Sequence, residues 1–212
     1  RLRDREAASS SVDLALSIEP GLLEARRMKL QMQRDGGDKR ELVQLLLKEA
    51  AQHPEPEQAA DLWIEAARTQ MEFARDRDEL ESALSWAKEA DAASPRRTDT
   101  VELWAELAER VGLEQELQTA LDRLVRRTHE PGKKLWARVR LARAAHAADN
   151  PLRAAEESLH FLSSYAELEE STVEEVARRF GSSPRELLQD MLTLAADATE
   201  AAKLWNEHLQ VL

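Results

Sequence analysis

Small or apolar residues recur along this chain at an interval close to 34 residues, and this period restricts the fold more than any other feature. They are Ala8, Leu42, Ala83, Ala120 and Ala154, and the steps between them are 34, 41, 37 and 34 residues. A proline follows the first four of them, at Pro20, Pro54, Pro95 and Pro131. Because a proline ring cannot accommodate another helical turn before it, each proline predicts the end of a helix. Periods of this length are typical of stacked helix pairs.

The interior of each unit repeats as well. The second helix of a pair carries a small residue, an apolar residue four positions later and a small residue three further on, as in Ala83, Ala87 and Ala90. The first helix carries a tryptophan three residues before a leucine and four before a small residue, as in Trp104, Leu107 and Ala108. Small side chains at these points let the two backbones approach closely, and neighbouring pairs must stack because one pair cannot bury its own apolar face.

Over about residues 8–166 this pattern resembles the tetratricopeptide repeat (TPR) family, although the glycine and tyrosine positions of that family are mostly lost. The resemblance implies an all-α fold, a right-handed superhelix of antiparallel helix hairpins that is called a TPR-like α-solenoid. It also implies a scaffold that binds a peptide or a partner protein along a concave helical groove, and not an enzyme. Other α-solenoid families would give a similar period.

The composition agrees with helices, because alanine, leucine, glutamate and arginine dominate and long alternating β-branched segments are absent. Asn150-Pro151 and the Ser183, Pro184, Glu186 group predict helix starts. We expect TPR-like helical repeats over residues 1–166 and C-terminal helices that cap the solenoid over 167–212. The expected helices are 4–18, 21–34, 38–52, 56–74, 78–93, 98–111, 113–128, 132–147, 151–165, 172–180 and 184–210.

The segment 172–191 offers an alternative function. Ala177, Gly181 and Leu187 have the spacing of helix-turn-helix DNA readers. A transcriptional regulator is therefore one alternative, and a non-catalytic accessory domain of a larger enzyme is another. The formal net charge of −11 argues against nucleic acid and against an anionic membrane as partners. The would-be recognition helix also places Glu186 and Asp190 beside its one arginine, Arg185.

Residues with catalytic or metal-binding chemistry are sparse in the sequence. There is no cysteine, which excludes disulfides and thiolate ligands and fits a cytoplasmic protein. None of the five histidines pairs with another at the spacing of a zinc helix, and no phosphate-binding glycine loop or nucleophile elbow occurs. No apolar run has the length of a membrane span. We therefore predict no cofactor, no metal and no catalytic residue.

The resemblance does predict a binding face, because the first helices of TPR pairs line the concave side. Carried over position by position, the partner-binding candidates are Arg27, Gln31, Arg34, Arg68, Met71, Trp136 and Arg143. Arginines in three units would attract an acidic peptide or a terminal carboxylate. They would equally pair with neighbouring glutamates or extend along the surface to water. The lysine and asparagine pattern of the carboxylate-clamp members is missing, which disfavours a chaperone C-terminus as ligand.

Overall fold

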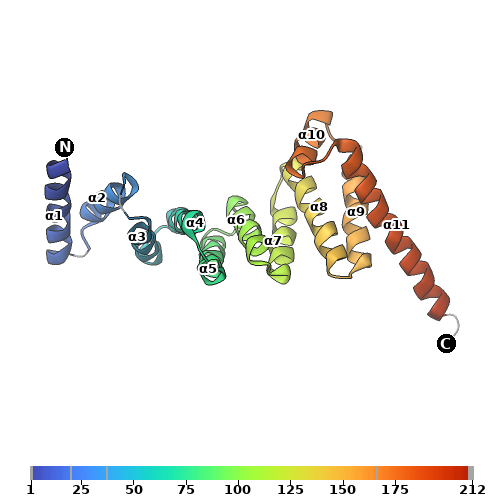
Figure 1. Ribbon diagram of the computed structural model, residues 1–212, viewed down its shortest axis with the longest axis horizontal. Helices are drawn as coiled ribbons and strands as arrows, with labels where there is room; N and C mark the ends of the chain where they lie inside the picture. The colour runs from blue at the N-terminus through green and yellow to red at the C-terminus, as the bar shows by residue number, and fades with distance from the viewer. Residues whose placement is uncertain (1, 20, 37, 166, 210–212) are drawn as a thin grey trace. The chain divides into compact units, whose positions relative to one another are not determined.

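The computed structural model describes residues 2–19, 21–36, 38–165 and 167–209, and these residues form eleven α-helices and no strand (Figure 1). Each helix begins and ends within two residues of its predicted range. The largest shifts are at the starts of α1, α2 and α10, which begin at residues 2, 23 and 170 instead of 4, 21 and 172. The helices are α1 Leu2–Ile18, α2 Leu23–Arg34, α3 Lys39–Gln52, α4 Pro56–Phe73, α5 Arg77–Ala93, α6 Asp99–Val111, α7 Glu114–Arg127, α8 Pro131–Ala147, α9 Pro151–Tyr165, α10 Glu170–Arg179 and α11 Pro184–Leu209.

The chain divides into two compact units, Arg1–Pro95 with α1 to α5 and Arg96–Leu212 with α6 to α11. Within the units, α1 to α5 and α6 to α9 each pack against the next helix in the chain, and α10 packs against α11. The second unit adds three contacts between helices that are not consecutive, because α10 packs on α8, and α11 packs along α9 and also contacts α8 (Figure 1). The division at residue 166 into repeats and a capping segment remains a prediction. The boundary between the two units lies at Pro95, and residue 166 falls inside the second unit.

Short-range chemistry explains where the helices start and stop. The Asp76 side chain caps α5 by accepting a bond from the Glu79 N–H at 2.9 Å. Glu186 accepts bonds from the backbone and hydroxyl of Ser183 at 2.7 and 2.8 Å, which confirms the predicted capping box. These bonds stabilise the charged carboxylate and lower the pKa of Glu186. Pro131 was expected to end a helix, but α7 already ends at Arg127 and Pro131 is the first residue of α8, where its missing N–H costs nothing.

A left-handed glycine turns the chain between α6 and α7. Gly112 has a φ of 76°. This left-handed conformation is energetically unfavourable for any residue that has a side chain. The Gly112 N–H donates to the carbonyl of Glu109 at 3.1 Å, and the next N–H, of Leu113, donates to that of Ala108 at 2.9 Å. These bonds satisfy carbonyls at the end of α6, as in other glycine-terminated helices.

Alanines line the contacts between the paired helices, as the repeat predicted. Six of the expected small residues have 0–1% of their surface exposed: Ala67 and Ala83 in the first unit, and Ala108, Ala120, Ala142 and Ala154 in the second. Ala8 of α1 differs, because it is exposed. They lie on helices that pack together, α4 with α5, α6 with α7 and α8 with α9. Close approach of small side chains therefore joins each hairpin.

An apolar cluster of the second unit joins its last four helices. Leu135 and Val139 of α8 pack with Phe161 of α9, and Leu187 and Met191 of α11 complete the cluster. Val176 and Ala177 add the buried side of α10. This cluster holds α10 beside α8, so that the end of α10 and one face of α8 lie close together.

Candidate functional site

The second unit contains a cleft of about 440 Å³ between α6, α7, α8 and the end of α10. Apolar residues line part of it, namely Ala108, Leu113, Leu117 and Ala144. The remaining lining includes two aromatic side chains, Trp136 and Phe180, three arginines, Arg140, Arg143 and Arg179, and two carboxylates, Glu109 and Glu114. Glu114 and Leu117 belong to α7, so three consecutive helices and the end of α10 form the cleft. We call it the arginine cleft.

Each aromatic ring of the arginine cleft carries a stacked guanidinium. The Arg140 Cζ lies 4.9 Å from the centroid of the Trp136 ring, and the Arg143 Cζ lies 4.7 Å from that of Phe180. Such contacts favour the cation by attraction to the face of the ring and leave the N–H edge of the guanidinium available for hydrogen bonds. The cleft therefore combines flat apolar surfaces with oriented donors.

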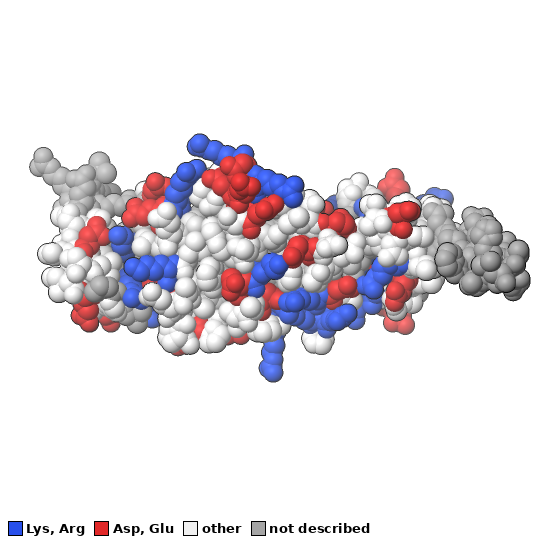
Figure 2. All heavy atoms as spheres, turned by 90° about the horizontal axis from the view of Figure 1, so that it is seen from below, with Lys and Arg blue, Asp and Glu red and all other residues white. Residues whose placement is uncertain are grey.

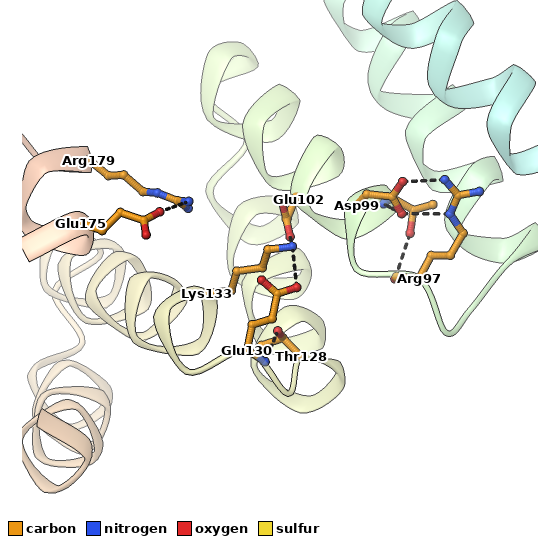
Figure 3. Close-up of polar contacts among 9 residues, drawn as sticks. Arg97, Asp99, Glu102, Thr128, Glu130, Lys133, Glu175 and Arg179 are labelled. Carbon is orange, nitrogen blue, oxygen red and sulfur yellow. Dashed lines mark hydrogen bonds and ion pairs between the residues drawn. The ribbon is translucent and has the colours of Figure 1, made fainter. Parts of the chain in front are cut away.

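Two parallel ion pairs tie α8 to α6 beside the cleft. Lys133 of α8 pairs with Glu102 of α6 at 2.9 Å and with Glu130 at 3.0 Å (Figure 3). Seven residues farther along both helices, Arg140 pairs with Glu109. The hydrogen bond to Glu102, with the weaker help of Glu130, raises the pKa of Lys133. The two pairs hold the walls of the cleft in register.

The other two cleft arginines also have carboxylate partners. Arg143 donates from Nε and Nη2 to one oxygen of Asp190 in α11, at 2.9 and 2.8 Å. Arg179 donates to Glu175, one turn earlier in α10, at 2.8 Å (Figure 3). Arg143 thus has a carboxylate partner, although this is an aspartate from α11 and not one of the neighbouring glutamates that were expected. Opposite charges are likewise interspersed over the face of the molecule in Figure 2.

The first unit contains a separate groove of about 580 Å³ between α2 and α4. Three predicted binding residues, Arg27, Gln31 and Arg34, lie along it. Arg34 donates to both carboxylate oxygens of Glu65, at 2.6 and 2.5 Å, and this bond raises the pKa of the guanidinium. The fork-like geometry shows that a carboxylate fits this arginine well.

The structure groups most of the predicted binding residues but not all of them. Trp136 and Arg143 both line the arginine cleft, and the indole of Trp136 is half-buried. Arg68 is exposed and Met71 is half-buried farther along α4, and neither lines the groove or the cleft. Whether any of these side chains binds a partner remains a prediction.

The sequence prediction missed Arg140, Arg179 and Phe180. Arg140 could have been found, because it lies four residues after Trp136 and so shares its helix face. Arg179 and Phe180 follow the point at which the repeat fades. No periodic signal placed that segment beside α8.

The helix-turn-helix residues are used in the core. Ala177 and Leu187 are fully buried, and Gly181 has a φ of 64° in the turn between α10 and α11. The exposed arginines of this region are Arg178, Arg179 and Arg185. They are accompanied by Glu175, Glu186 and Asp190, so the charge here is mixed. Phosphate binding requires a more basic surface.

Metal-binding and membrane-spanning features are absent from the part of the chain whose structure is described. No cluster of three or more histidine, aspartate or glutamate side chains there could hold a metal ion. No helix within those residues is both long and apolar enough to cross a membrane.

Comparison with known proteins gives structural neighbours only. No family model matches the sequence, and no curated protein matches it. Among solved structures, BtubC (BKLC) from P. vanneervenii is 11% identical over all of this chain and 89% of its own, with a TM-score of 0.53. MamA is 15% identical over 77% of this chain and 90% of its own, with a TM-score of 0.51. A thermophilic TPR protein from Thermus thermophilus is 20% identical over 84% and 91%, with a TM-score of 0.43.

Proposed function

From the fold, which is that of a TPR-like α-solenoid as the repeat period predicted, we propose that the chain is a protein–protein interaction scaffold. The arginine cleft binds a segment of the partner. The observation that carries this proposal is the convergence of two aromatic rings and three arginines on one cleft, formed by α6, α7, α8 and the end of α10. Tryptophan and arginine are the residues that most often dominate binding energy at protein interfaces.

The chemistry of the cleft favours a segment that is both acidic and apolar. Guanidinium edges recognise carboxylates, whereas Trp136, Phe180 and Leu113 offer surface to an aromatic or aliphatic side chain. The volume of about 440 Å³ is in the range of sites that hold a few side chains of a ligand. The net charge of −11 would repel an acidic partner elsewhere, so the local arginines must supply the attraction.

The first-unit groove supplies a second surface of related chemistry. Arg27, Gln31 and Arg34 lie beside Met28 and Leu62, so polar donors again border apolar side chains. We regard this groove as secondary because its largest apolar residues are aliphatic and it lacks an aromatic anchor among the residues that line it.

Selection from a random peptide display library, with the full chain as bait, tests the proposal. The expected result is enrichment of peptides that contain carboxylates and an apolar side chain. The cleft variant is Leu113→Glu, which places a negative charge among the cleft residues. The matched control is Leu159→Glu on the exposed surface of α9, where the leucine is 59% exposed. The enriched peptides should lose binding to the first variant and keep it with the second.

The melting temperature of both variants should remain close to that of the parent, since neither leucine is buried. If no peptide is enriched, or if Leu113→Glu and Leu159→Glu bind the enriched peptides equally well, the arginine cleft is not a binding site.

A further inference from the structure

We propose that Asp190 occupies, in the free protein, the place at which a carboxylate of the partner is held, so that the partner binds by exchanging with Asp190 on Arg143. This inference rests on the proposed function of the arginine cleft. It names one step of recognition and makes α11 an internal competitor for the site.

The bonding of Arg143 supports an exchangeable carboxylate. One edge of its guanidinium, through Nε and Nη2, converges on a single oxygen, Oδ2 of Asp190. One face of the same group lies on the Phe180 ring at 4.7 Å. Phe180 thus holds the guanidinium in place whether or not Asp190 is bonded to it. A carboxylate that arrives from solution would find the same donor edge already oriented.

The exposure of the pair shows that it can open at low cost. The side chains of Arg143 and Asp190 are 42% and 40% exposed, so water can replace each partner. The neighbouring pair of Arg138 and Glu157 differs, with exposures of 14% and 6%, and breaking it would leave buried charge without a partner. Exposure therefore distinguishes a replaceable pair from a structural one.

Asp190 lies outside the lining of the arginine cleft. It comes from α11, whereas Arg143 is one of the lining residues. Release of Arg143 from Asp190 therefore removes no lining residue and leaves the aromatic rings in place. The Arg140–Glu109 pair is a less suitable point of exchange, because the Arg140 side chain is only 13% exposed and ties α8 to α6.

The test compares affinities of labelled peptides, taken from the library selection above, for the full chain and its variants. Asp190→Asn removes the competing charge and should tighten binding by about two- to fivefold, the effect expected for losing a solvent-exposed ion pair that competes with the ligand. In the Arg143→Gln background, Asp190→Asn should change the affinity little, because the exchange needs the guanidinium.

Glu114→Gln is the control for general electrostatics. Glu114 lines the cleft, but it accepts a hydrogen bond from Gln118 of its own helix at 3.3 Å and not from Arg143. Its removal changes the net charge by the same amount. The gain from Asp190→Asn should exceed that from Glu114→Gln, and the difference should persist at raised salt concentration, where long-range attraction is screened.

Three outcomes would overturn the exchange. Equal gains for the two variants would mean that only net charge matters. Unchanged affinity in Asp190→Asn would mean that Asp190 does not compete. Weaker binding would mean that Asp190 orients Arg143 for the ligand. In each case peptides that depend on Leu113 would still support the proposed function. If no such peptide exists, the proposed function fails and the exchange fails with it.

Discussion

Replacing Ala120 with leucine should force α6 and α7 apart. Ala120 has no exposed surface, and the small residue at the matching point of α6, Ala108, has none either. The larger side chain must enter an interface that Trp104, Leu107 and Leu124 already fill, with exposures of 3%, 0% and 0%. Overpacking of this kind typically costs about 1–3 kcal/mol of the free energy of unfolding.

For a unit of this size, 1 kcal/mol corresponds to roughly 4 °C in melting temperature, so the expected decrease is about 4–12 °C. Circular dichroism of thermal unfolding measures it. Ala196→Leu is the matched control, because it makes the same change in the same unit on the exposed surface of α11 and should stay within about 0.5 kcal/mol. A melting temperature of Ala120→Leu equal to that of the control would refute the argument that small side chains permit the close approach.

Two further variants probe the ion pairs. Glu157→Ala should lower the free energy of unfolding in urea by about 3 kcal/mol. The Glu157 side chain is only 6% exposed, accepts a hydrogen bond from Arg138 at 2.8 Å and pairs with Arg153 at 2.9 Å, so its removal leaves these arginine charges without a partner. A decrease in the free energy of unfolding below about 0.5 kcal/mol, the value for an exposed ion pair, would contradict this. The hydrogen bond from Arg97 lowers the pKa of Asp99 in the folded protein. The ionised Asp99 therefore contributes its full stabilisation above the pKa of the unfolded state, and this stabilisation is lost as the pH falls through the pKa of the folded state. Melting temperature should therefore fall more steeply in the parent than in Asp99→Asn between about pH 5 and pH 2, and parallel curves would rule this out.

The helices could be predicted from the sequence because their ends are determined by local chemistry. The capping box at Ser183 and Glu186 needs only residues three apart, and the structure confirms it. The burial of Ala108 and Ala120 could be predicted for a similar reason, since a hairpin with a short turn brings residues at a constant spacing together. Pro131 was misinterpreted because a proline fits both after a helix and at the first position of the next one.

The candidate site could be predicted only in part. The repeat placed Trp136 and Arg143 on the inner side of α8, and the arginine cleft contains both. Phe180 and Asp190 could not be found in that way, because the angle at which α10 and α11 return to α8 and α9 depends on apolar packing between segments far apart in the sequence. Arg143 and Asp190 are 47 positions apart, and no local rule relates them.

The order in which the helices pack also has a kinetic consequence. Most of the packing joins helices that are consecutive in the chain, so only short loops close when each hairpin forms. The contact of α11 with α9 closes a longer loop, which includes all of α10, and the entropy cost of closure grows with that length. We therefore expect the hairpins of the second unit to form early in refolding and the docking of α11 to follow as a later, slower phase.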